Sequence, residues 1–329
     1  IYQGFILSRQ QYSSKHSEGI TLCYWLASDH GPIKVVIENQ QAVFFISQDQ
    51  QQHAQQLLDK ARISVNFKTI EMSHFNGKAC VACYFNNTSS IYKARTLFEN
   101  TITVYEGDIR HSDRFLMERF IRGGVWVTGD VSQKNGFLLI QNAKLKANTD
   151  YTPKLKSLSL DIECDGEGVL FSIGLVGNGL DCVLMIGEPH NHSEQINIDW
   201  CLDELELLTK LHTYLSSNDP DIIIGWNVIE FDFTVLNARA EALGISLKLG
   251  RDNQPININT GHYTRLTLPG RCVVDGIDTL KNATYHFDNY SLGNIAEKVL
   301  GEAKLIQSDN RLGEIIRQFN EDKLTLAAY

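Results

Sequence analysis

The sequence has no apolar run that approaches the roughly 18 residues required of a membrane-spanning helix. Its first residues also lack the basic, apolar and small-residue regions of a secretion signal. We therefore expect a cytoplasmic protein with no membrane partner. Because the chain starts at Ile1 rather than at a methionine, we also expect other residues to precede it in the natural protein.

Paired cysteines are scarce as well. Seven cysteines are scattered through the chain, an odd number that favours free thiols in a reducing compartment. Cys80 and Cys83 form one CxxC motif, but no second CxxC or suitably spaced cysteine–histidine pair accompanies it. A β-strand that happens to contain two cysteines therefore explains this motif better than a zinc or redox site does.

The chain also lacks the positive charge of a protein that binds nucleic acid through the phosphate backbone alone. Its formal net charge is −9, and the acidic excess lies in residues 151–329. An acidic surface still allows a site in which metal cations lie between carboxylates and a phosphate. The arginines of residues 109–124 could form a phosphate-facing row, although a solvated surface explains most of them more simply.

The length of 329 residues and a change in sequence pattern predict two domains, residues 1–150 and 151–329. The first contains mainly short runs rich in Val, Ile and aromatic residues, which are typical of strands. Helices are predicted there at 49–61 and 91–100. A polar segment at 144–156 looks like the linker to the second domain.

Strands and helices alternate in the second domain. The pattern predicts strands at 158–163, 169–177, 181–187, 221–227 and 271–276, with helices at 201–215, 231–244 and 291–301. This order predicts an α/β fold with a mixed sheet flanked by helices, preceded by a β-rich domain.

One predicted strand carries two acids on its polar side. In SLSLDIECDGEG, residues 157–168, apolar side chains share one face, whereas Asp161 and Glu163 share the other. The two carboxylates lie about 7 Å apart along the strand, and each makes ionisation of the other more costly. Solvent, basic side chains or metal cations must offset this repulsion. A solvated strand edge is the simplest alternative.

A third acid begins a predicted helix. In DIIIGWNVIEFDF, residues 221–233, a buried strand leads to a turn at Asn227, and Asp232 opens the helix that follows. Sheets of α/β proteins place their sites at such strand ends, and a helix N-terminus favours a negative charge. Taken alone, however, this segment is explained more simply by a turn former and an ordinary first-turn acid.

Together the two segments resemble the 3′–5′ exonuclease domain of the family B DNA polymerases. LSLDIECDG resembles the first exonuclease motif, and DPDIIIGWNVIEFDFTVL resembles the second over strand, turn and helix. VYEGDIRHSDRFLMERFI resembles the N-terminal domain of the same family, and LGRDN and VVDGIDTLK resemble its bacterial members. The resemblance covers most of the chain from about residue 100 onward and, more weakly, GFILSR near the start.

The resemblance implies a ribonuclease H-like exonuclease domain that binds DNA and two divalent metal ions. Oxygen-only ligands suit Mg²⁺ or Mn²⁺. By this resemblance Asp161 binds both ions, Glu163 binds the ion that activates water, and Asp232 binds the second ion. Asn227 and Phe231 contact the frayed 3′ strand, although core packing is an equal alternative for Phe231.

The third motif of the family, Tyr-x-x-x-Asp on a helix, is matched by EDKLTLAAY only as far as Tyr329. The resemblance implies that Tyr329 orients the attacking water; an ordinary exposed helix residue is the alternative. Because the aspartate is expected four residues later, we expect residues 1–329 alone to bind metal weakly and to degrade single-stranded DNA poorly.

The polymerase motifs SLYPSII and YxDTDS are absent from the sequence. The implied DNA polymerase activity, with primer–template DNA and a sliding clamp as candidate partners, is therefore expected of a longer parent protein. Two other functions stay open. A non-catalytic nucleic-acid-binding module would be expected to have lost one of the three acids, and a free-standing exonuclease would not need the N-terminal domain.

Overall fold

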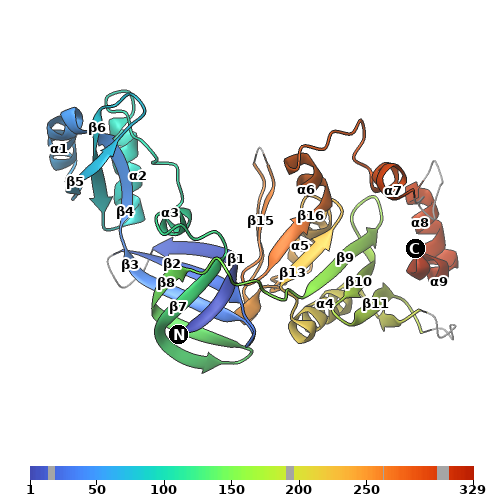
Figure 1. The fold of residues 1–329 in the computed structure, drawn as a ribbon. Helices are drawn as coiled ribbons and strands as arrows, with labels where there is room; N and C mark the ends of the chain where they lie inside the picture. Colours follow the sequence, from blue (N-terminus) through green and yellow to red (C-terminus); the bar gives the residue numbers. More distant parts are fainter. Residues whose placement is uncertain (14–18, 190–195, 262, 302–310) are drawn as a thin grey trace. The chain divides into compact units, whose positions relative to one another are not determined.

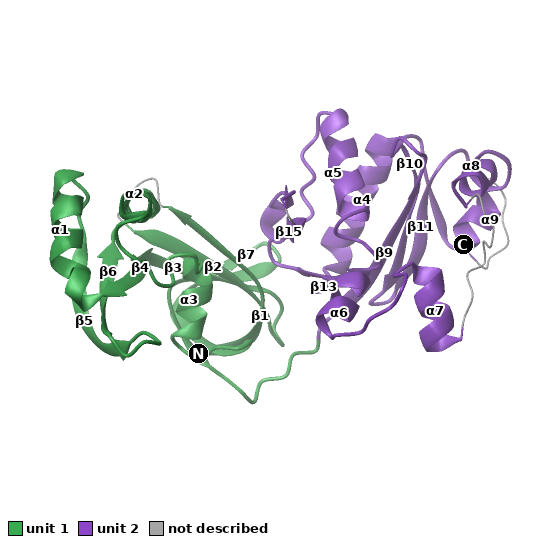
Figure 2. Cartoon of the chain, turned by 90° about the horizontal axis from the view of Figure 1, so that it is seen from above, with its two compact units in different colours: residues 1–154 green, residues 155–329 purple. Residues whose placement is uncertain are grey.

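A computed structural model describes residues 1–13, 19–189, 196–261, 263–301 and 311–329 (Figure 1). They form two compact units, unit 1 (Ile1–Lys154) and unit 2 (Leu155–Tyr329), which Figure 2 colours separately. Each unit has its own cluster of buried apolar side chains, as expected of separate domains. None of the helices within these ranges is long and apolar enough to cross a membrane.

Unit 1 is built around a closed barrel of five strands. Their order is β1 (Tyr2–Ser13), β2 (Ile20–Ala27), β3 (Ile33–Gln40), β8 (Phe137–Ala147) and β7 (Gly124–Lys134), which pairs with β1 again. Neighbouring strands are antiparallel except β3 and β8, which run parallel. Closure leaves these five strands without a free sheet edge.

A smaller α/β layer is inserted in the chain between β3 and β7. It consists of β4 (Ala42–Ser47), η1 (Gln48–Gln50), α1 (Gln51–Lys60), β5 (Asn66–Ser73), β6 (Ala79–Phe85), α2 (Thr88–Phe98) and α3 (His111–Met117). The three strands pair antiparallel in the order β4, β6, β5. Phe44 of β4 packs edge-on against Phe98 of α2, with 5.8 Å between ring centroids, in a core continuous with that of the barrel.

The predicted strands and helices of unit 1 are confirmed, but β5, β8 and α3 were missed. β8 includes residues 144–147, so the predicted linker was wrong over these positions. Buried Ala143 and Leu145 alternate there with exposed Lys144 and Lys146, and a strand with one face in solvent looks like a polar linker. Cys80 and Cys83 are free thiols on β6, as the plain-strand interpretation predicted.

Unit 2 contains the predicted mixed sheet. Its six strands follow the order β12 (Ile198–Cys201), β11 (Leu180–Ile186), β10 (Leu170–Gly177), β9 (Ser157–Cys164), β13 (Ile222–Gly225) and β16 (Cys272–Asp275). β9, β10 and β11 are antiparallel, whereas β13 is parallel to both β9 and β16. The carboxyl ends of β9, β13 and β16 therefore lie at the same edge of the sheet.

Helices cover both faces of this sheet. Leucines of α4 (Glu204–Asn218) and Phe233 of α5 (Asp232–Ala242) pack with Leu160 and Ile162 of β9. On the other face lie α8 (Arg311–Glu321) and α9 (Lys323–Ala328), where Phe319 stacks on Phe171 with centroids 4.0 Å apart. The other elements are η2 (Arg251–Asn253), β14 (Asn257–Asn259), β15 (Arg265–Thr267), α6 (Gly276–Asn282) and α7 (Leu292–Leu300).

A buried ion cluster lies where β13 and β16 begin. Arg251 and Arg271 both donate to Asp219 Oδ1 over 2.9 Å, and Arg251 also donates to Asp221 Oδ1 over 2.8 Å. Burial alone would raise the pKa of Asp219, but the hydrogen bonds and charges of the two guanidinium groups hold that pKa below its usual value. The carboxylate is therefore held in its ionised form.

Replacing Asp219 by asparagine should lower the free energy of unfolding of unit 2 by about 2–4 kcal/mol at neutral pH, because two buried guanidinium groups lose a counter-charge. The contribution of Asp219 is complete above the unfolded pKa of about 3.9 and is lost as the pH falls through its lower folded value. The free energy of unfolding, measured with urea at a series of pH values, should therefore fall less steeply at acid pH for Asp219→Asn than for the wild type. An identical fall in both proteins would contradict this account.

Candidate active site

Five of the six predicted site residues lie on one cleft. The cleft has a volume of about 1290 Å³ and lies at the carboxyl ends of β9, β13 and β16. Its lining includes Asp161, Glu163, Asn227, Phe231 and Asp232. The alternation predicted for β9 is confirmed. The apolar side chains of this strand are buried, whereas Asp161 is exposed and Glu163 is half-buried. Two segments about 70 residues apart in the chain thus contribute to one site.

Asp232 joins its helix to the strand that carries the other acids. It is the first residue of α5 and is only 1% exposed. Strand β13 pairs with β9 as far as Ser159, and beyond that point Asp232 Oδ1 accepts a hydrogen bond from the backbone N–H of Ile162 over 3.1 Å. This contact fixes the carboxylate beside the backbone between Asp161 and Glu163.

The three acids disfavour one another's charge. Burial first, then the charge of Asp161 and more weakly that of Glu163, raises the pKa of Asp232 to about 7. Hydrogen bonds from its own backbone and from Ile162 act in the opposite direction. A buried carboxylate beside two others is a group that a nearby cation would stabilise.

Arg311 brings a positive charge to this cleft. Its guanidinium donates to Glu163 Oε1 over 3.5 Å and lies 5.5 Å from the ring centroid of Tyr329. Burial, and then the charges of Glu163 and Asp161, raise the pKa of Tyr329 against the opposing effect of Arg311. Tyr329 is therefore within electrostatic reach of both acids, although it is not part of the cleft lining.

The acids share the cleft but do not yet surround one point. Within the described ranges, no three His, Cys, Asp or Glu side chains are grouped closely enough to hold one metal ion. Mutual repulsion keeps carboxylates apart, and two of them have other partners: Arg311 for Glu163 and the Ile162 N–H for Asp232. A metal site formed by these acids would require their side chains to rotate.

The turn between β13 and α5 presents Asn227 and Phe231 to the cleft. Asn227 has a φ of 61°, a left-handed conformation that asparagine adopts more readily than most residues. Phe231 is 44% exposed, so its ring is not part of the core. Buried Asp275, at the end of β16, accepts the N–H of Ile229 over 3.1 Å and so fixes the turn.

Three further residues at or beside the cleft, Trp226, Gly276 and Arg311, were not predicted from the sequence to belong to the site. Trp226 Nε1 donates to the carbonyl of Tyr290 over 3.0 Å, which links the turn after β13 to the segment before α7. A Cβ at Gly276 would lie 2.6 Å from the Trp226 ring, so the glycine allows this close approach. For Trp226 a signal was available in the sequence, because it is an aromatic residue directly after a predicted buried strand. For Arg311 the sequence contained no such signal, because its proximity to Glu163 arises from tertiary packing.

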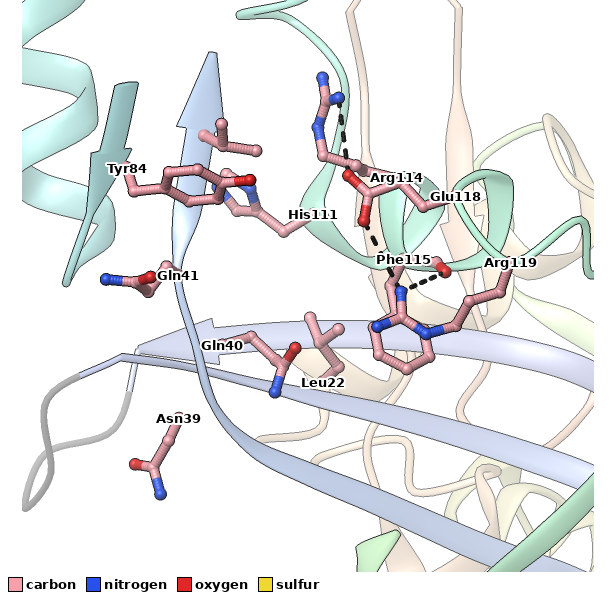
Figure 3. A pocket seen from close by; sticks show the side chains of 11 residues that line it. Leu22, Asn39, Gln40, Gln41, Tyr84, His111, Arg114, Phe115, Glu118 and Arg119 are labelled. Atoms are coloured by element: carbon pink, nitrogen blue, oxygen red, sulfur yellow. Dashed lines mark hydrogen bonds and ion pairs between the residues drawn. The ribbon is translucent and has the colours of Figure 1, made fainter. Parts of the chain in front are cut away.

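Unit 1 has a separate pocket of about 230 Å³ beside α3 (Figure 3). Arg114, expected to be solvated or phosphate-facing, is instead buried and paired with Glu106 over 2.8 Å. Arg119 pairs with Glu118, the one carboxylate in the described lining. This pocket therefore lacks the set of acids found in unit 2.

Comparison with known proteins assigns both units to one family. Residues 180–295 match the family model for "DNA polymerase family B, exonuclease domain", and residues 4–41 match that for "DNA polymerase II, N-terminal". Unit 2 thus contains a segment of an exonuclease domain, and the chain belongs to the family B DNA polymerases.

Among individual relatives, DNA polymerase II of Escherichia coli K12 is 37% identical over 99% of this chain and 42% of its own length. DNA polymerase 3 of Saccharolobus shibatae is 24% identical over 64% of this chain and 26% of its own length. The family B DNA polymerase structure from Pyrobaculum calidifontis shares the fold over 99% of this chain and 43% of that chain, with a TM-score of 0.76 and 16% identity. This chain thus spans less than half of each of these relatives.

Proposed function

We propose that unit 2 is a 3′–5′ exonuclease that removes the terminal nucleotide from single-stranded DNA. We further propose that the whole protein is a DNA polymerase in which this activity proofreads newly made strands during replication and repair. The observation that carries the proposal is the position of Asp161, Glu163 and Asp232 on one cleft, together with Asn227 and Phe231. The family match supports it, because residues 180–295 fit the exonuclease domain of this family.

The donor set of the cleft fits two divalent cations. Asp161, Glu163 and Asp232 offer only oxygen ligands, which suit Mg²⁺ or Mn²⁺. In this proposal Asp161 would hold both ions, Glu163 would hold the one that activates water, and Asp232 would hold the other. When bound, such ions supply a nucleophile from water and neutralise charge at the phosphate and the leaving oxygen.

The remaining residues bind the strand and orient the attacking water. The pKa of Tyr329 is raised above a usual value of 10.0, so its phenol is protonated at neutral pH with or without this shift, and the hydroxyl can hold a water in position. Phe231 stacks on a base of the frayed 3′ strand, and the Asn227 amide contacts the same strand. Contact of the parent protein with a sliding clamp stays a prediction from the family resemblance.

The direct test uses the full-length protein that contains these residues, with a single-stranded oligonucleotide labelled at its 5′ end and with Mn²⁺. We expect products that shorten one nucleotide at a time from the 3′ end and that disappear when EDTA removes the metal. Internal cuts, or cleavage that persists in EDTA, would contradict the proposed function. Absence of cleavage despite DNA binding would favour the non-catalytic binding module.

Replacing Phe231 by alanine should raise the KM for single-stranded DNA by about 5- to 150-fold, because one stacked base contributes about 1–3 kcal/mol. Stability should change little, since the ring is 44% exposed. Steady-state digestion across oligonucleotide concentrations measures the effect. Phe75→Ala is a matched control, because Phe75 is a fully exposed phenylalanine of unit 1. An unchanged KM in Phe231→Ala would rule out the stacking role.

A further inference from the structure

We propose that the ion pair between Glu204 and Arg239 positions the two parts of the candidate metal site relative to each other. The proposal rests on the exonuclease function proposed above. Glu204 is the first residue of α4, and Arg239 lies on α5 about two helical turns after Asp232. Neither residue belongs to the described lining of the cleft, so both act through other residues.

The pair is held in a fixed orientation. Arg239 donates from Nε to Glu204 Oε1 over 2.9 Å and from Nη2 to Glu204 Oε2 over 2.5 Å. The two side chains are 24% and 13% exposed, so solvent screens their attraction only partly. Two parallel hydrogen bonds between a guanidinium and a carboxylate define direction as well as distance. The contact can therefore set the angle of α5, not merely attract it.

Glu204 also contacts the β9–β10 strand pair close to the position of Glu163. Its Oε1 accepts the backbone N–H of Leu170, the first residue of β10, over 2.9 Å. At this point the register of β10 against β9 shifts by one residue, because Leu170 is opposite Cys164 whereas Ser172 is opposite Glu163. Such irregularities disturb the ladder and re-aim neighbouring side chains. Glu204 thus stabilises the irregular end of the strand pair.

Helix α5 is therefore attached to the β9–β10 pair at two points. One is the hydrogen bond between Asp232 and Ile162, and the other runs from Arg239 through Glu204 to Leu170. Apolar packing in the core of unit 2 holds α5 against the sheet but is not directional, whereas the two polar attachments fix the orientation of the helix. Metal binding by side chains from both elements depends on their relative placement. Loss of the second attachment should therefore weaken metal binding without removing a ligand.

A series of substitutions separates the contributions of the pair. Arg239→Met and Glu204→Leu remove the ion pair, and Glu204→Leu also removes the acceptor for Leu170. Arg239→Lys keeps the charge, and Glu204→Gln keeps an acceptor. We expect Arg239→Met and Glu204→Leu to weaken Mn²⁺ binding by about tenfold or more, as loss of outer partners does at metal sites. The two conservative variants should show smaller losses.

Lys210→Met is the matched control. Lys210 also lies on α4, its side chain is 25% exposed, and it pairs with Asp199 of β12 over 2.7 Å. Breaking this pair removes a helix-to-strand ion pair of similar burial that does not connect α5 with β10. We expect Lys210→Met to lower stability as Arg239→Met does, but to leave Mn²⁺ affinity unchanged. An equal loss of affinity in both variants would overturn the positioning role.

The experiment has two readouts in the full-length protein. Electron paramagnetic resonance, carried out without DNA, measures the affinity of the protein for Mn²⁺. The part of this binding that is lost in Asp161→Ala is assigned to the candidate metal site. Hydrogen exchange without metal measures protection of the peptides that contain Ile162 and Leu170, and it should fall in Arg239→Met but not in Lys210→Met. Unchanged affinity and unchanged exchange in Arg239→Met would refute the positioning role. If the wild type has no Asp161-dependent Mn²⁺ binding, the exonuclease proposal fails instead, while exchange still tests the second attachment.

Discussion

Replacing Asp161 by alanine is expected to reduce the release of 3′-terminal nucleotides by at least about 10³-fold, equivalent to about 4 kcal/mol of transition-state stabilisation. In the proposed function Asp161 binds both metal ions, so its loss disrupts the whole catalytic centre. Its side chain is exposed on β9 and contributes little to the core, so the fold should persist. Single-turnover digestion of a 3′-labelled oligonucleotide by the full-length protein measures the chemical step.

The matched control for Asp161 is Asp181→Ala. Asp181 is an exposed aspartate on β11 of the same sheet, and it lies outside the described cleft lining. This variant should digest DNA at the wild-type rate, whereas Asp161→Ala should not. If Asp161→Ala kept more than about a tenth of the rate, the carboxylate would be a solvated strand residue, as the simplest explanation of the sequence holds.

Replacing Asp232 by asparagine is expected to have two opposite effects. Cleavage should fall as severely as in Asp161→Ala, because a proposed metal ligand loses its charge. The metal-free protein, however, should become more stable by about 1–3 kcal/mol, because an almost completely buried charge near two other acids is removed. Asparagine can still accept the hydrogen bond from Ile162. Urea unfolding in EDTA, together with the cleavage assay, measures both effects.

Asp275 provides the contrasting control for Asp232. It is 5% exposed at the end of β16, and its two oxygens accept the N–H groups of Ile277 and Ile229. Asparagine there would direct its NH₂ group at a backbone donor, so Asp275→Asn should destabilise the fold. A loss of stability in Asp232→Asn as well would show that Asp232 is a structural first-turn acid, contrary to the proposed role.

The sequence predicted best what depends on local pattern. The period of two over residues 157–164 correctly separated the buried face of β9 from that of Asp161 and Glu163. A buried strand, a turn and a helix likewise placed Asp232 at the start of α5. Their common position on one cleft followed from the rule that strand ends meet at one edge of a parallel sheet, together with the family resemblance.

Much of what the sequence did not predict depends on long-range packing. Glu204 and Arg239 are 35 residues apart, and in the sequence they look like ordinary charged residues of two helices. Their ion pair becomes evident only when α4 and α5 are placed beside each other. Strand β12 was also missed, because its four residues include Asp199 and lack the continuous apolar run by which the equally short β13 was predicted. The approach of Arg311 to Glu163 likewise has no local signal, because it depends on where α8 packs against the sheet.

The most direct test is to locate Mn²⁺ by anomalous scattering in crystals of the full-length protein grown with Mn²⁺ and a short single-stranded oligonucleotide. We expect two anomalous peaks roughly 3.5–4 Å apart between the carboxylates of Asp161, Glu163 and Asp232. Saturating Mn²⁺ with the 3′ end bound in the cleft, but with no peak at these three carboxylates, would contradict the proposed metal site.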